Sequence, residues 1–136
     1  MILFYFGTIA FHGLHGRIPD EIQYLEKLEA LILQYNPALG GSLPGAISKL
    51  TNLRTMSIEQ CSLSGSMIPD WIGEMTQLTR LGLGDNRLTG SVPRSIQKLV
   101  NLLALSLDDN VLAADLELFG HLTDLRYLYL DDNRIE

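Results

Sequence analysis

The chain has 136 residues, of which 46% are hydrophobic and 19% are charged, and its formal net charge is -6. A chain of this length builds one domain with its own core, and this composition excludes wholesale disorder and a bundle of membrane helices. Ten Lys and Arg residues against 16 Asp and Glu residues argue against nucleic acid as the main partner, because phosphate contacts require a basic face.

The only long apolar run is MILFYFGTIAF at residues 1–11. It has about half the length of a membrane-spanning helix, so no membrane span is predicted. It has no Lys or Arg ahead of the apolar region and no small-x-small cleavage site, the two marks of a signal peptide. We interpret residues 1–24 as a degenerate or partial first repeat, with Phe4 and Ile9 in the repeat register and Gly7 breaking it. A signal-peptide remnant and an incorrectly assigned start are the alternatives.

Leucine supplies 27 residues, and their spacing reveals a repeat. Five copies of the pattern LxxLxxLxLxxN follow one another at steps of 25, 25, 24 and 23 residues. They begin at Leu25, Leu50, Met75, Leu99 and Leu122. Chance does not preserve five such registers, so we predict one repeat domain over residues 1–136 whose last repeat is incomplete.

Each copy contains a short predicted strand. In the third copy Leu81 and Leu83 alternate with Arg80 and Gly82, the period of a strand with one buried face. Such a strand is too short to be stable alone, but stacked about 4.8 Å from its copies it joins a parallel sheet. The leucines then fill a continuous core, where each contributes about 1.5–3 kcal/mol when fully buried.

One polar position recurs where the chain leaves each strand. A side-chain amide there satisfies backbone groups that the turn leaves inside the coil. The predicted internal ladder is Asn36, Cys61, Asn86, Asn110 and Asn133. Cys61 is the only cysteine, so no disulfide within the chain is possible. A buried structural thiol is favoured over a reactive one.

Glycine and proline follow the polar position in LHGRIP, LGGSLP, LSGSMIP and LTGSVP. Proline suits the first position of a short helix because its φ is fixed and it lacks an N–H. We therefore predict short 3₁₀ or α-helical turns on the back of the arc. These turns are expected to begin at Pro19, Pro44, Pro69 and Pro93.

The fourth copy departs from this pattern, since no glycine or proline follows Leu112 until Gly120. We predict that its second short strand is lost and that a helix covers Asp115 to His121. Asp115 is expected to cap this helix, with Leu116, Phe119 and Leu122 facing inward.

The extended pattern LxxLxxLxLxxNxLxGxIP resembles the plant-type leucine-rich repeat of receptor-like kinase and receptor-like protein ectodomains and of polygalacturonase inhibitors. The resemblance covers nearly all of residues 14–136. It implies an α/β solenoid, a right-handed superhelix shaped as a horseshoe arc, with a parallel sheet on the concave face and short helical segments on the convex face. It also implies sensing of a protein, peptide or carbohydrate by a receptor-like protein or by an inhibitor of a secreted enzyme.

The chain lacks the paired cysteines that plant ectodomains carry at each end, and it has no Asn-x-Ser/Thr sequon. An extracellular or cell-surface place follows from the resemblance, and an intracellular scaffold stays open as the alternative. The absence of polar caps at the ends indicates a segment of a longer array. A small protein closed by its own hydrophobic start is the other interpretation.

Outward-facing residues form rows across the predicted concave sheet. The first two rows are Phe6, Ala30, Thr55, Arg80, Ala104, Tyr127 and Thr8, Ile32, Ser57, Gly82, Ser106, Tyr129. The next two are Gln34, Glu59, Gly84, Asp108, Asp131 and Tyr35, Gln60, Asp85, Asp109, Asp132. Exposed tyrosines are enriched at interfaces. The predicted ligand-binding residues are Tyr35, Glu59, Arg80, Asp85, Asp108, Asp109, Tyr127, Tyr129, Asp131 and Asp132.

Carboxylates gather at one edge of this sheet, where the sequence LDDN occurs in two consecutive copies. Three interpretations stay open: plain solvated acidity that caps the turn, recognition of a basic peptide or protein loop, and a calcium ion held by several oxygens.

No enzyme motif is present: the chain has no phosphate-binding glycine loop with lysine, no Gly-x-Ser-x-Gly elbow and no zinc-spaced ligands. We predict a non-catalytic module without a cofactor or a metal. An ice-binding or adhesive lattice is disfavoured, because the row of Thr8, Ser57 and Ser106 is interrupted by Ile32 and Gly82.

Overall fold

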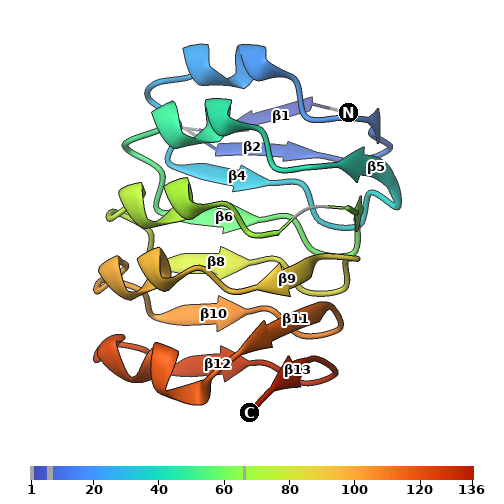
Figure 1. Cartoon of the computed structure of the whole chain (residues 1–136). Coiled ribbons are helices and arrows are strands. Elements are labelled where there is room, and N and C mark those ends of the chain that lie inside the picture. Colours follow the sequence, from blue (N-terminus) through green and yellow to red (C-terminus); the bar gives the residue numbers. More distant parts are fainter. Residues whose placement is uncertain (1, 6–7, 66) are drawn as a thin grey trace.

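The computed structural model describes residues 2–5, 8–65 and 67–136, and for residues 2–5, 8, 9 and 11 it describes the backbone alone. The chain winds as a solenoid whose coils lie side by side (Figure 1). Seven strands form the largest sheet, in the order β1-β2-β4-β6-β8-β10-β12. Their bounds are β1 Ile2–Tyr5, β2 Thr8–Phe11, β4 Ala30–Ile32, β6 Thr55–Ser57, β8 Arg80–Gly82, β10 Ala104–Ser106 and β12 Tyr127–Tyr129.

From β2 to β12 neighbouring strands are parallel and keep the register of the repeat. Leu81 of β8, for example, pairs with Met56 of β6 and with Leu105 of β10. Because every coil contributes the same positions, residues of one row lie directly beside each other on the sheet. The parallel stacking expected from the repeat is therefore present.

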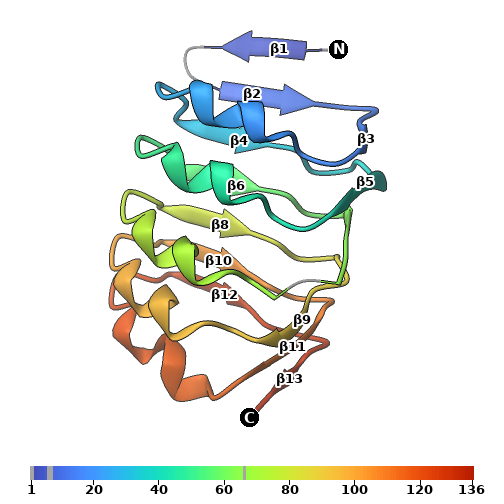
Figure 2. The same cartoon turned by 45° about the horizontal axis from the view of Figure 1, so that its top comes forward.

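Two smaller sheets form one side of the solenoid, where the chain has left the main sheet (Figure 2). Each has three strands, in the orders β3-β5-β7 and β13-β11-β9. Their bounds are β3 His15–Gly16, β5 Ala38–Gly41, β7 Ser62–Leu63, β9 Thr89–Ser91, β11 Val111–Ala114 and β13 Arg134–Ile135.

Five 3₁₀ turns form the back of the coils, as expected. They are η1 Asp20–Tyr24, η2 Gly45–Lys49, η3 Asp70–Glu74, η4 Arg94–Lys98 and η5 Leu116–His121. The four prolines lie one residue earlier than predicted, at the N-cap with extended backbone, as Pro93 does with φ -70° and ψ 142°. This placement leaves the first turn its full set of N–H groups, which proline cannot supply.

The core lies between the main sheet and the 3₁₀ turns. Leu31, Met56, Leu81 and Leu105 each expose at most 1% of their surface. Leu128 takes the same place in the last coil but is 38% exposed, because β12 is the outermost strand. The interior row is therefore closed over four coils and open at the fifth.

The fourth coil differs from its prediction in two respects. The second strand is not lost: β11 pairs with β9 on one side and with β13 on the other. Val111 is a β-branched residue that favours a strand, and the pairing of β11 with β9 and β13 forms without the glycine turn. The helix forms, and the Asp115 carboxylate caps it by accepting the Glu117 N–H at 3.0 Å. Leu116, however, points outward and is 56% exposed.

The correct inward residue is Leu118, which packs against the core together with the buried Phe119 and Leu122. Leu116 is the first residue of η5, directly after the cap residue Asp115, so the three-residue spacing that joins Phe119 to Leu122 does not extend back to it.

The N-terminal run forms an antiparallel hairpin of β1 and β2, in which Phe4 pairs with Ile9. β2 then pairs in parallel with β4, with Thr8 opposite Ala30 and Ile9 opposite Leu31. The predicted register, with Thr8 in the row of Ile32, is therefore wrong by two residues. An unbroken apolar run fits more than one register, because several of its residues can take a leucine position. Phe6 and Gly7 lie outside the described residues.

Among the described residues, the longest helical segment has six residues. No described helix is long and apolar enough to cross a membrane.

Candidate ligand-binding face

The ten predicted ligand-binding residues all lie on the open face of the main sheet or on the loops that leave it. Glu59 and Asp108 are half-buried and the other eight are exposed. Tyr127 and Tyr129 are the first and last residues of β12 and are 58% and 50% exposed. Arg80 lies near the middle of the face, between Thr55 and Ala104.

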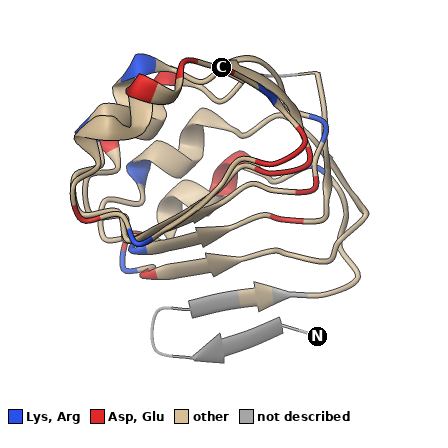
Figure 3. Cartoon of the chain, turned by 90° about the horizontal axis from the view of Figure 1, so that it is seen from below, with Lys and Arg blue, Asp and Glu red and all other residues tan. Residues whose placement is uncertain are grey.

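The structure brings only part of this set together. Tyr35 follows β4, whereas Tyr127 and Tyr129 lie on β12, and β6, β8 and β10 separate the two strands. The tyrosines therefore do not form one patch. The acidic residues do lie along one edge, on the loops where the chain leaves the strands (Figure 3).

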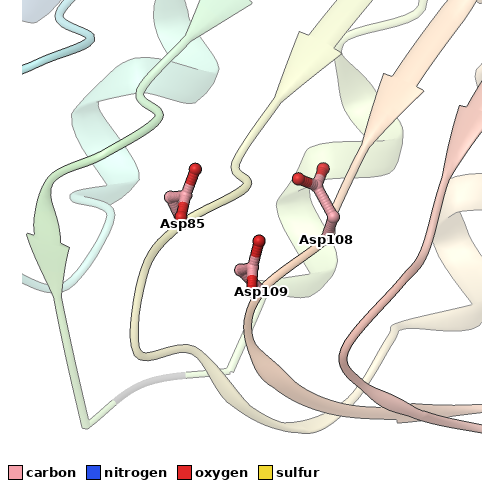
Figure 4. Close-up of side chains that lie close together, drawn as sticks. All are labelled: Asp85, Asp108 and Asp109. Carbon is pink, nitrogen blue, oxygen red and sulfur yellow. The ribbon is translucent and has the colours of Figure 1, made fainter.

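The centre of this edge is a cluster of Asp85, Asp108 and Asp109, which we call the acidic cluster (Figure 4). One carboxylate oxygen from each residue lies within 4.8 Å of the other two. Polar neighbours hold two of the three: Ser106 Oγ donates to Asp108 at 2.6 Å, and Gln60 Nε2 donates to Asp85 at 3.2 Å. The arrangement is thus partly fixed before any partner binds.

Two glycines make room for carboxylates on this face. The Glu59 carboxylate lies against Gly82, where a side chain would otherwise stand. In the same way, an oxygen of Asp108 lies 2.8 Å from where a Cβ of Gly84 would be. The sequence predicted Gly82 and Gly84 only as members of the outward-facing rows. It gave no indication that the carboxylate of a neighbouring coil lies over each glycine.

Electrostatics within the group act against ionisation. Burial, followed by the charges of Asp108 and Asp85, raises the pKa of Glu59. Desolvation and the carboxylates of Asp85, Asp132 and Asp108 raise the pKa of Asp109. A positive charge placed here would relieve this repulsion.

Backbone geometry accounts for part of the acidic pattern. The residue before each ladder position has a left-handed backbone with φ between 50° and 62°, at Tyr35, Gln60, Asp85, Asp109 and Asp132. Aspartate tolerates this conformation better than most residues. The second aspartate of LDDN therefore has a structural reason to be there, whereas Glu59, Asp108 and Asp131 do not share it.

The ladder asparagines bridge successive coils. Asn86 Oδ1 accepts the Leu63 N–H at 3.1 Å, and its Nδ2 donates to the Ile58 carbonyl at 2.7 Å, both in the preceding coil. In the same way Asn36, Asn110 and Asn133 accept the N–H groups of Leu14, Leu88 and Leu112. These bonds fix the loops that carry the acidic residues.

Cys61 replaces one of these bridges. Its Sγ donates to the Leu33 carbonyl at 3.2 Å, but a thiol is a much weaker acceptor than an amide oxygen. The Leu39 N–H instead donates to the Asn36 carbonyl at 2.9 Å. The side chain is 7% exposed, and burial raises the pKa of its thiol.

Comparison with known proteins decides what this solenoid is. A family model described as leucine rich repeat matches residues 76–135. The described coils continue the same parallel pattern back to β4. The fold of the chain is that of a leucine-rich-repeat solenoid.

Solved structures similar to this chain include plant receptor ectodomains. It is similar to the ectodomain of the receptor kinase SOBIR1 from Arabidopsis thaliana, with 25% identity and a TM-score of 0.86 over 93% of this chain and 69% of that chain. It is also similar to a TDR receptor, with 29% identity and a TM-score of 0.87 over 94% of this chain. The resemblance to plant receptor ectodomains is therefore confirmed, as are the solenoid fold and its parallel sheet.

A third similar structure is a plant ice-binding protein, with 34% identity and a TM-score of 0.83 over 90% of this chain. The leucine-rich-repeat chain spans 39% of that protein and 22% of the TDR receptor. No curated protein matches the chain in sequence.

Proposed function

We propose that the chain is a non-catalytic recognition module that binds a protein or peptide segment containing Lys or Arg on the concave face of its sheet. The observation that carries this proposal is the meeting of Glu59 with the acidic cluster, in a place where burial and neighbouring carboxylates raise the pKa of Glu59 and the pKa of Asp109. A cation at this place gains attraction from several charges at once.

The surrounding surface suits such a segment. The sheet is open and its outward residues are small near the cluster, as at Gly82, Gly84 and Ser106. Tyr127 and Tyr129 lie beside the acidic edge and present exposed rings. Aromatic rings also attract Lys and Arg side chains.

Similar structures supply further support. One is PEPR1–AtPEP1, with 28% identity and a TM-score of 0.86. Another is the receptor kinase HAESA in complex with the peptide hormone IDA and the co-receptor SERK1, with 32% identity and a TM-score of 0.83. This chain covers 18% and 20% of those two proteins. A receptor-like setting is what we propose, with an intracellular scaffold and an inhibitor of a secreted enzyme as the alternatives.

An array of peptides of equal length and varied Lys and Arg content tests the proposal. We expect retention to increase with basic content and to fall with salt, because the attraction is screened. The double variant Asp108→Asn, Asp109→Asn should weaken the best binder about tenfold. Asp70→Asn is the matched control, since Asp70 is exposed on η3 at the back of the coils. Equal loss in both variants, or no dependence on basic content, contradicts the proposal.

Ice binding is a second candidate, favoured by the likeness to the plant ice-binding protein. The exposed row Thr51, Thr76, Val100 and Thr123 occupies one position in successive coils, on the loops that lead into the strands. Inhibition of ice recrystallisation by the chain, lost in Thr76→Lys, would establish this function. Undiminished ice growth at high protein concentration would remove it.

A further inference from the structure

The coil that contains β6 is one residue longer than the coil that contains β8, and we call these two the β6 coil and the β8 coil. In the β6 coil two residues lie between Gly65 and the buried Ile68. In the β8 coil a single residue lies between Gly90 and the buried Val92. Both glycines have a positive φ, of 70° and 78°, so they hold the same place in their coils. Met67, directly before Ile68, therefore belongs to a stretch that is longer by one residue.

The strand pairing at the side of the solenoid is interrupted between these two coils. β7 of the β6 coil and β9 of the β8 coil belong to different sheets. Among the described residues, an isolated bridge of Ser64 with Arg87 joins the two sheets, and the Arg87 N–H donates there to the Leu63 carbonyl at 2.8 Å. β9 and β11, by contrast, are paired over three successive residues. The β6 and β8 coils therefore have less backbone pairing on this side than the coils that follow.

Met67 packs across this interruption. Its Cγ and Sδ lie 2.5 Å and 2.8 Å from the position that a Cβ of Gly90 would occupy. The thioether therefore lies directly on the backbone of the β8 coil, in the space that the glycine leaves free. This apolar contact adds to the attraction between two coils at a place where the strand pairing contributes little.

The sulfur that makes this contact is also accessible to solvent. Met67 is 61% exposed, whereas Met56 and Met75 expose 0% and 3% of their surface. Cys61 is buried, and Met1 lies outside the described residues. Because an oxidant must reach a sulfur lone pair, the rate of oxidation depends on this exposure. Of the described sulfur atoms, that of Met67 is therefore the one that an oxidant reaches most easily.

We propose that Met67 is a site of oxidation by hydrogen peroxide and that its sulfoxide loosens the contact between the β6 and β8 coils. In this step a sulfur lone pair attacks one peroxide oxygen, an S–O bond forms and the O–O bond breaks. The hydroxide that leaves takes the proton of the transferred oxygen and departs as water, so sulfur loses two electrons and the peroxide gains them. The sulfoxide oxygen is a polar acceptor that retains water, so the side chain moves off Gly90. The proposal does not rest on the function proposed above.

Peptide mapping by mass spectrometry after limited oxidation provides the first test. We expect the folded chain, treated with dilute hydrogen peroxide, to gain oxygen at Met67 about tenfold faster than at Met56 or Met75. In denaturant the three rates should become similar, because burial no longer protects two of the sulfur atoms. Similar rates at these three methionines in the folded chain would overturn the assignment of Met67 as the site.

Hydrogen exchange of single amides tests the effect on the coils. We expect exchange of the Arg87 N–H to become about tenfold faster once Met67 is oxidised. The Val111 N–H is the matched control, because it holds the same repeat position in the next coil and donates to the Leu88 carbonyl at 2.8 Å. Met67→Leu keeps an apolar side chain of similar volume and forms no sulfoxide, so peroxide should leave the exchange of Arg87 unchanged in this variant. Unchanged exchange at Arg87 after complete oxidation of Met67, or an equal rise at Val111, overturns the proposal.

Discussion

The Glu59 carboxylate of β6's following loop lies against Gly82 of β8, in the space that a side chain at residue 82 would fill. Burial and the nearby charges of Asp108 and Asp85 raise the pKa of Glu59 above its usual 4.5. The folded chain therefore holds this proton more tightly than the unfolded chain does.

This relationship sets the sign of a pH effect. Because the folded state binds more protons, the free energy of unfolding falls as pH rises from 4.5 through the raised pKa. We expect the melting temperature of the wild type to fall between about pH 5 and pH 7, and we expect this fall to be smaller in Glu59→Gln. Glu74→Gln, at an exposed position on η3, is the control and should leave the pH profile as in the wild type. If Glu59→Gln leaves the pH profile unchanged, the pKa of Glu59 is not raised in the folded chain.

The asparagine ladder predicts a large loss at one residue. Asn86→Ala removes bonds to the Leu63 N–H and to the Ile58 and Leu83 carbonyls, all buried. We expect the free energy of unfolding in urea to fall by about 3 kcal/mol, since several buried groups lose their partner. Asn101→Ala removes one exposed bond to the Thr76 carbonyl and should cost about 1 kcal/mol or less. Similar costs for the two variants would contradict a structural role of the ladder.

Gly73 predicts a steric effect on the back of the coils. An added Cβ would lie 2.5 Å from the Ser95 carbonyl oxygen and 2.6 Å from the Ser95 Cβ, so η3 and η4 would have to move apart. We expect Gly73→Ala to cost about 1–3 kcal/mol. Gly120 holds the same place in η5 and has nothing within 4 Å of an added Cβ. Gly120→Ala should therefore leave the melting temperature nearly unchanged, and an equal drop in both variants would exclude the steric cause.

Cys61 predicts slow thiol chemistry. The thiol is buried and its pKa is raised, and the thiolate is the reactive form. Labelling with a thiol reagent at neutral pH should therefore be slow in the folded chain and fast in denaturant. Rapid labelling without denaturant would place Cys61 at the surface.

The acidic cluster predicts a weak response to calcium. Calcium takes about six to eight oxygens at about 2.3–2.6 Å, whereas the cluster places three carboxylates within 4.8 Å of one another. We expect millimolar Ca²⁺ to raise the melting temperature no more than Mg²⁺ does at equal concentration. A calcium-specific rise that Asp108→Asn abolishes would instead establish a bound ion.

Regular positions were predictable from the sequence, because one period fixes strand, turn and ladder in every coil. The rows from Ala30 to Tyr127 and from Ile32 to Tyr129 are found as predicted. The period fails where it is interrupted. At the N-terminus, Thr8 lies two residues from its predicted register, because several apolar residues of this run can take a leucine position and residues 1–24 contain no asparagine to fix the alignment.

The candidate site shows the same division. Period alone put Asp85, Asp108 and Asp109 on one edge, but it gave no sign that Glu59 lies over Gly82. That contact depends on how the flexible Glu59 side chain is oriented across the neighbouring strand. The repeat pattern of the sequence does not predict side-chain orientation. The extended side strand β11 was missed for a related reason, since glycine was treated as a requirement of the strand.

The bridge from each asparagine back to the preceding coil gives the solenoid a direction. The Leu63 N–H donates to the side-chain oxygen of Asn86 in the following coil. The Leu88 N–H donates in the same way to Asn110. During synthesis on the ribosome, a finished coil thus lacks these bonds until the next coil has emerged and packed against it. Growth from the amino end therefore leaves the most recently formed coil as the incomplete one.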